Sequence, residues 1–99
     1  MTVSDIRENN KLILKLGGQF DTSASIEFSK SLSMLLKGVD DVTFDFADLD
    51  YITSAGLRLL LTTQKTMADR GGKMQVTNLN ESVLEIFKIT HFIDLLNVK

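Results

Sequence analysis

The chain has 99 residues, 43% of them hydrophobic, with 11 basic and 13 acidic side chains and a formal net charge of −2. This size predicts a single domain, residues 1–99, with one modest core. The absence of Cys excludes disulfides, thiolate metal sites and a cysteine nucleophile. No basic face is available for nucleic acid, and no apolar run is long enough for membrane insertion. Because the start of the chain is not a signal peptide, we expect a cytoplasmic location.

The first elements predicted are two strands, Thr2–Glu8 and Lys11–Leu16, joined by a tight Asn-Asn turn. In the second strand every other residue is leucine, which is the period of a sheet with one buried face. The following Gly17-Gly18 pair is expected to end that strand.

A helix is predicted over Asp21–Lys37, with Asp21 or Thr22 capping its start and Gly38 stopping it. Its apolar face recurs near helical spacing. The residues of that face are Ala24, Phe28, Leu32, Leu35 and Leu36.

A third strand follows, in which Val42, Phe44 and Phe46 alternate with polar residues, and then a loop over Ala47–Thr53. The clearest helix is Ser54–Arg70, ended by Gly71-Gly72. We expect one side of this helix to carry Leu57, Leu60, Leu61, Gln64 and Ala68.

The last elements are a short strand, Lys73–Thr77, a helix capped by Asn80, and an apolar tail, Phe92–Val98, that packs back on the body. The predicted order is β-β-α-β-α-β-α. Right-handed crossovers then give an α/β fold with a four-stranded mixed sheet, the hairpin strand at one edge and helices mainly on one face.

No catalytic set is visible, so we do not expect an enzyme or a cofactor. The single His91 lies in an apolar stretch and is interpreted as a packed or capping residue. Asp45, Asp48 and Asp50 are interpreted as acidic residues of a solvated loop, because a hard-cation site needs a defined set of oxygen ligands. Neither glycine pair has the spacing of a phosphate loop.

The most informative segment is Tyr51–Arg58, in which a Thr-Ser pair and two small residues precede an amphipathic helix. One interpretation is that Thr53 or Ser54 is only an N-cap. The other is a switch, because a phosphate on Ser54 would add about −1.5 to −2 charges beside free N–H groups. In that second interpretation, Ala55 and Gly56 keep the serine uncrowded. Spacing alone leaves both interpretations open.

The run Asp45–Leu57 resembles the STAS domain, and within it the anti-sigma factor antagonists, whose pattern here is D-S-[ST]-G-L. Gly18-Gln19-Phe20-Asp21 resembles the G-x-[LF]-D element of that family. Gly71-Gly72-Lys73 and the later Val83-x-x-Ile86-Phe87 are similar to its G-G turn and last helix. Thr53 stands where the best-known antagonists have Asp, and Ala55 where they have Ser or Thr.

The resemblance implies partner switching: the unphosphorylated protein would bind an anti-sigma factor that is also a serine kinase, and so release a sigma factor. Phosphorylation at Ser54 would abolish binding, and a metal-dependent PPM-type serine phosphatase would reverse it. The resemblance implies a partner-facing region around that serine. Its residues would be Asp21, Thr22, Thr53, Ala55, Gly56, Leu57 and Arg58.

A second hypothesis is that the chain is a STAS accessory subunit of a transporter ATPase complex, without a phosphorylation switch. In either case, the lack of a long exposed apolar stripe in the sequence is compatible with a monomer.

Overall fold

The computed structural model describes residues 1–99 and contains one four-stranded mixed sheet. The strands follow one another across the sheet in chain order, with the first antiparallel to the second and the other neighbours parallel. The predicted fold class, with the hairpin strand at an edge, is therefore confirmed. The strands are β1 (Thr2–Glu8), β2 (Lys11–Phe20), β3 (Asp41–Ile52) and β4 (Lys73–Thr77).

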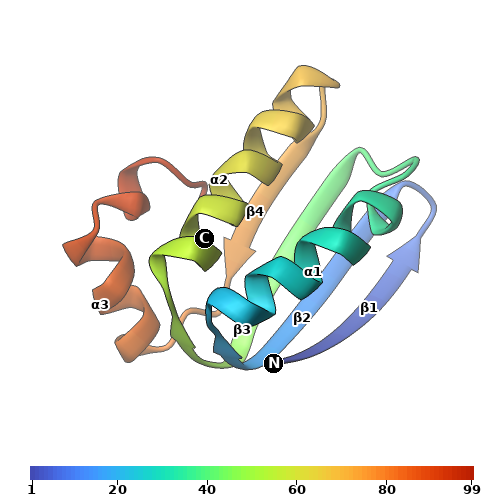
Figure 1. The fold of residues 1–99 in the computed structure, drawn as a ribbon. Coiled ribbons are helices and arrows are strands. Elements are labelled where there is room, and N and C mark those ends of the chain that lie inside the picture. Colours follow the sequence, from blue (N-terminus) through green and yellow to red (C-terminus); the bar gives the residue numbers. More distant parts are fainter.

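The first two α-helices lie over one face of this sheet and the third lies to the side of them (Figure 1), and a short 3-10 helix, Phe92–Asp94, follows. A single core of 21 buried apolar side chains fills the space between the two layers. Four aromatic contacts run through it, from Phe20 through Phe28, Phe44 and Phe46 to Phe87. The helices are α1 (Thr22–Leu35), α2 (Ser54–Asp69) and α3 (Glu81–Ile89).

The two central strands are longer than predicted. β2 continues through Gly17 and Gly18 to Phe20, and β3 continues through the predicted loop, 47–53, as far as Ile52. The sequence pattern did not reveal the full length of these strands, because β3 carries an extra residue relative to β2 at two places. Each irregularity resets the alternation, so the buried side chains are three apart instead of two. These side chains are Phe46, Leu49 and Ile52.

The buried side of α2 also differs from the prediction. Leu57 and Leu60 are buried as expected, whereas Leu61 and Gln64 are only half-buried and Ala68 is exposed. Gly56 takes a sheet-facing position, where the lack of a side chain lets the helix approach the strands closely. Thr63 and Met67 are buried as well. The buried set is Gly56, Leu57, Leu60, Thr63 and Met67.

The end of α2 confirms the predicted glycine stop. Gly71 has a left-handed backbone with φ of 75°, and the N–H of Gly72 donates to the carbonyl of Met67 at 2.7 Å. This is the bonding of a Schellman motif, in which the last carbonyls of a helix find donors just beyond its end.

One edge of the sheet is covered by the C-terminal tail, and the other edge is open. Beside β4, the predicted tail packs back: Val98 forms a bridge with Val76, and the Lys99 N–H donates to the Val76 carbonyl at 2.9 Å. Leu96 of the same tail is buried. By contrast, β1 has a neighbour on one side only, and all its residues are exposed. None of the helices combines the length and apolar character needed to span a bilayer.

Candidate functional site

The helices α1 and α2 begin side by side at the same end of the sheet (Figure 1). The reason is the register of the parallel strands, in which Phe20, the last residue of β2, pairs with Ile52, the last residue of β3. Each strand is followed by one cap residue and then by a helix. The cap of α2 is tied to the neighbouring strand, because the Thr53 N–H donates to the Phe20 carbonyl at 3.0 Å. The carboxyl ends of parallel strands are where open α/β sheets place their binding sites.

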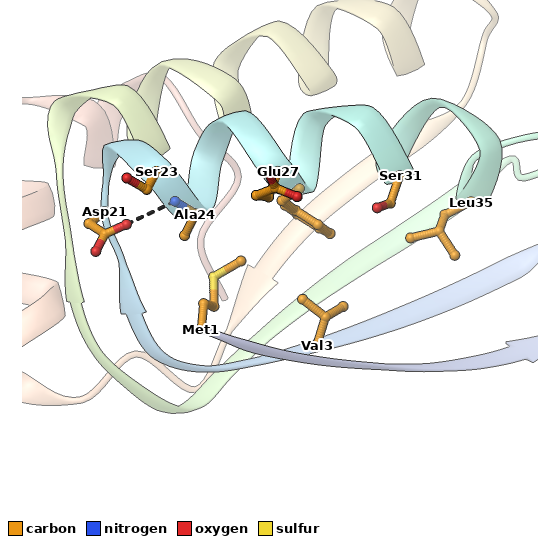
Figure 2. A pocket seen from close by; sticks show the side chains of 9 residues that line it. Met1, Val3, Asp21, Ser23, Ala24, Glu27, Ser31 and Leu35 are labelled. Atoms are coloured by element: carbon orange, nitrogen blue, oxygen red, sulfur yellow. Dashed lines mark hydrogen bonds between the residues drawn. The ribbon is translucent and has the colours of Figure 1, made fainter.

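Asp21 is the N-cap of α1. Its Oδ1 accepts a hydrogen bond of 2.8 Å from the Ala24 N–H, which decides between the two cap candidates (Figure 2). Thr22 is therefore the first helical residue, and it is exposed. The cap places a carboxylate at the positive end of the α1 dipole, where negative charge is favourable.

Thr53, and not Ser54, is the N-cap of α2. Its Oγ1 donates to the Phe20 carbonyl at 3.2 Å and accepts from the Gly56 N–H at 3.4 Å. Ser54 is the first helical residue, it is exposed, and its hydroxyl makes no hydrogen bond within the chain. The capping requirement is thus met by the neighbouring residue, which leaves the Ser54 hydroxyl free for another role.

Gly56 has a packing role that the sequence did not reveal. It is buried, and a Cβ built on it would lie 2.9 Å from Ile52 Cγ1 and 3.1 Å from the Phe20 ring. The first turn of α2 therefore rests directly on the ends of β2 and β3, which explains a glycine in a helix. The sequence-based idea that Gly56 keeps Ser54 uncrowded is wrong, since the glycine faces the core.

The residues predicted to face a partner divide into two groups. Gly56 and Leu57 are buried, so they offer no surface to a partner and instead pack the first turn against the core. The other members lie around Ser54 at the exposed or half-buried surface of this end of the sheet. They are Asp21, Thr22, Thr53, Ala55 and Arg58.

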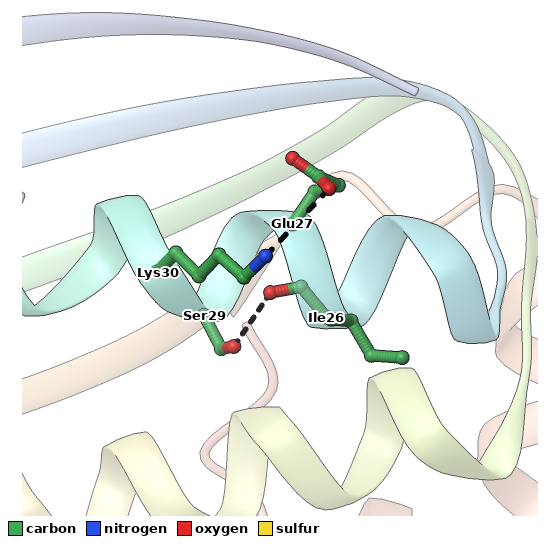
Figure 3. A network of polar contacts seen from close by, with 4 residues as sticks. All are labelled: Ile26, Glu27, Ser29 and Lys30. Carbon is green, nitrogen blue, oxygen red and sulfur yellow. Dashed lines mark hydrogen bonds and ion pairs between the residues drawn. The ribbon is translucent and has the colours of Figure 1, made fainter.

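The charges near Ser54 are few. Neither α1 nor α2 has an acidic residue in its first turn. Arg58 lies one helical turn beyond Ser54, is exposed, and forms no ion pair. The chain's single ion pair joins Glu27 and Lys30 on the exposed side of α1, at 4.0 Å (Figure 3). A new negative charge at Ser54 would therefore meet helix N–H groups, one free arginine and the Asp21 carboxylate of the neighbouring cap.

The acidic residues after the third predicted strand lie within β3 itself, and not in a solvated loop. Asp45 accepts hydrogen bonds from the Ala47 N–H and the Asn78 amide, both at 3.0 Å. Burial raises the pKa of the Asp45 carboxyl, but these two bonds and nearby Lys15 outweigh it and hold the pKa below its ordinary value. Asp45 thus anchors the first irregularity of β3 and the turn after β4.

His91 is exposed and follows the C-cap of α3. Its backbone is left-handed, with φ of 64°, and its N–H donates to the Lys88 carbonyl at 3.1 Å. It belongs to the helix stop, so the capping interpretation describes its backbone and the packed interpretation is wrong. No group of three or more His, Cys, Asp or Glu side chains is placed to hold a metal ion.

A groove of about 440 Å³ runs beside the site, between α1 and the start of β1 (Figure 2). Met1 and Val3 form one wall, and Phe28 and Leu35 contribute apolar surface from α1. Asp21 lies at the end of this groove, so the α1 cap joins it to the surface around Ser54. No local pattern indicated the groove, because its two walls come from β1 and α1, which β2 separates in the chain.

The model of the STAS domain family matches residues 3–99. The anti-sigma-B factor antagonist of Bacillus subtilis (strain 168) is 25% identical over 95 residues, covering 95% of this chain and 87% of that protein. The anti-sigma factor antagonist SpoIIAA in its unphosphorylated form superposes with a TM-score of 0.84 at 16% identity, over 99% of this chain and 88% of that one. The phosphorylated form of Bacillus SpoIIAA gives a TM-score of 0.76 at 15% identity, over 99% and 91%.

Proposed function

This chain belongs to the STAS domain family, and on that basis we propose that it is an anti-sigma factor antagonist that acts by partner switching. In its unphosphorylated form it binds an anti-sigma factor through the surface around Ser54, and the sigma factor held by that partner is released. Phosphorylation of Ser54 ends the association.

The observation that carries the proposal is the free hydroxyl of Ser54 at the start of α2. Thr53 already caps the helix, so the Ser54 oxygen is not needed for folding and stands exposed beside Asp21 and Thr22. A partner seated on this end of the sheet would cover the hydroxyl. A phosphate there would place about −1.5 to −2 charges inside the contact, at a cost in desolvation and repulsion.

The same geometry supports a switch that leaves the fold intact. A phosphate at the first helical residue lies beside backbone N–H groups that have no partner within the helix, and the helix dipole favours it. Arg58, four residues on, is free to approach the added charge. The first turn stays fixed meanwhile, because Gly56 rests on Phe20 and Ile52 beneath it.

The proposal includes two enzymes that act on the chain. The anti-sigma factor is itself the serine kinase for Ser54, and a PPM-type serine phosphatase removes the phosphate. Both need access to the hydroxyl, and the exposure of Ser54 provides it.

The test uses the purified chain and the anti-sigma factor kinases encoded beside its gene. With ATP, we expect a mass increase of one phosphate on the peptide that contains Ser54, and none after Ser54→Ala. Ser54→Asp should weaken partner binding at least about tenfold, or about 1.4 kcal/mol, whereas Ser54→Ala should preserve it. The matched control is Ser82→Asp, because Ser82 is also exposed in the first turn of a helix, α3.

Equal binding by the two Ser54 variants, with no kinase modifying the chain, would contradict the proposal. That result would favour the alternative, in which the chain is an accessory subunit of a transporter ATPase. The relative and the SpoIIAA structure named above are anti-sigma factor antagonists, so co-purification with a transporter ATPase would be the direct test of this alternative.

A further inference from the structure

The free edge of β1 is protected only by its charged side chains, which are of both signs. The other edge of the sheet is covered by the tail that pairs with β4, whereas β1 is unbulged and free of Pro and Lys. Its backbone N–H and C=O groups on the outer side have no neighbour in the chain. An open edge of this kind is a template for pairing with another strand.

The hairpin determines which residues of β1 present their backbone groups outward. The two-residue turn is closed by the pair Glu8–Lys11, which is therefore a hydrogen-bonding position. Bonding positions alternate along an antiparallel ladder, so every second residue from Glu8 bonds toward β2. The residues between them direct N–H and C=O groups to the free edge. These are Val3, Asp5 and Arg7.

We propose that this edge pairs with β1 of a second copy of the chain, antiparallel, with the two-fold axis at Ile6. In that register Asp5 of each copy lies opposite Arg7 of the other, and both are outward-bonding positions. Ser4 lies opposite Glu8, where a hydroxyl can donate to a carboxylate. Moving the axis to Asp5 would set two carboxylates face to face, and moving it to Arg7 would set two guanidinium groups face to face.

Neither Asp5 nor Arg7 is used in an ion pair within the chain, since only Glu27 and Lys30 form one. Arg7 donates to the Lys37 carbonyl at 2.6 Å, which holds its side chain over the inner face of β1. Opposite charges directly across a strand pair are favourable, so the sequence Asp5-Ile6-Arg7 is complementary to itself.

An apolar row supports the same axis. Ile6 pairs with Ile13 on the face of the sheet that no helix covers, and they are 53% and 38% exposed. With the axis at Ile6, the two copies of Ile6 meet at a non-bonded position, where side chains approach most closely. The isoleucines of both chains then form one continuous row across the joined sheets, which removes apolar surface from water.

The pairing covers only Ser4–Glu8 of each copy, so the interface is small and the association is weak and reversible. This changes the sequence-based expectation from a monomer to a monomer in equilibrium with a dimer. The interface lies toward the hairpin end of β1, and the Ser54 surface lies at the opposite end of the sheet. The inference therefore does not depend on the proposed function.

Cysteine substitution tests the register directly, because the chain has no Cys of its own. Opposed residues at a non-bonded position have Cα atoms about 4.5 Å apart, which suits a disulfide. We expect Ile6→Cys to give a disulfide-linked dimer under mild oxidation. Ser4→Cys lies on the same strand face, but its two copies would be about 13 Å apart, so it should stay monomeric. Ile26→Cys, on α1 at 55% exposure, is the control for random collision.

Charge exchange gives a second test without a covalent bond. Sedimentation should show the parent mass rising with concentration toward twice the 11.0 kDa of one chain. The mass of the Asp5→Arg variant should not rise with concentration, whereas the mass of the double variant Asp5→Arg/Arg7→Asp should rise as it does for the parent chain. A concentration-independent mass for the parent chain, or equal cross-linking of the Ile6 and Ser4 cysteine variants, would overturn the proposal. Thermal unfolding of each variant separates a loss of pairing from a loss of fold.

Discussion

The first turn of α1 is capped by a carboxylate, whereas the first turn of α2, which begins beside it, is capped by a hydroxyl. The α1 cap bond from the Ala24 N–H to Asp21 is 2.8 Å, and the α2 cap bond from the Gly56 N–H to Thr53 is 3.4 Å. The third helical residue differs as well. In α1 it is Ala24, which lines the groove, and in α2 it is Gly56, which rests on Phe20.

This difference separates two ways of starting a helix. The α1 end carries a fixed negative charge and a strong cap, so its electrostatic state is set by the sequence. The α2 end is neutral and is held mainly by close packing of its backbone against two strands. A neutral helix end with a free hydroxyl at its first residue can gain negative charge by phosphorylation, and in α2 that residue is Ser54. Matched substitutions at the two ends can test each part of this contrast.

Valine at the third helical position of each helix should separate the two ends most strongly. Gly56→Val should destabilise the protein by about 3 kcal/mol, because its Cβ alone would already press on Ile52 and Phe20. Ala24→Val should cost less than about 1 kcal/mol, since Ala24 is half-buried beside an open groove. Urea denaturation of the two variants measures both values. Similar costs would show that α2 does not depend on a close approach to the sheet.

The caps should give an intermediate effect. Asp21→Ala should cost about 1–2 kcal/mol, because the cap bond is short and its acceptor is charged. Thr53→Val keeps the side-chain shape but loses the long cap bond and the bond to the Phe20 carbonyl. We expect it to lower the free energy of unfolding by about 0.5–1 kcal/mol. Asp21→Asn is the control that keeps a cap without a charge. A larger loss for Thr53→Val in chemical denaturation would reverse the order proposed for the two ends.

Added charge at the first helical residue should change stability least. Ser54→Glu should stabilise the fold by about 0.3–1 kcal/mol at low salt, since α2 has no acidic residue in its first turn. Thr22→Glu should give a smaller stabilisation, because the Asp21 carboxylate already lies at the start of α1 and would repel the new carboxylate. Melting temperatures at low and high salt measure the difference, which salt should reduce. A gain for Thr22→Glu equal to that for Ser54→Glu would mean that Asp21 does not compensate the α1 dipole.

Much of the fold was predictable because it follows from local patterns. The alternating leucines of β2 and the helical spacing of Phe28 and Leu32 indicated the element types and their buried faces. The glycine stop after α2 was predictable as well, since it depends on local backbone preference. The far ends of β2 and β3 were missed, because two irregularities in β3 change the period of the buried side chains from two to three. The apolar spacing from Phe46 to Leu49 to Ile52 was the available signal.

Local sequence is enough to specify which residues can hold charge, cap a helix or form a core, because these properties belong to the side chain and its immediate neighbours. The Thr-Ser pair before α2 therefore marked Ser54 as a candidate, and the resemblance to the STAS family added Asp21 to the predicted site. The assembled fold was needed to establish that Thr53 is the cap, that Gly56 faces the core, and that β1 is left open while the tail covers β4. These outcomes depend on the register between strands far apart in the chain, which no local pattern specifies.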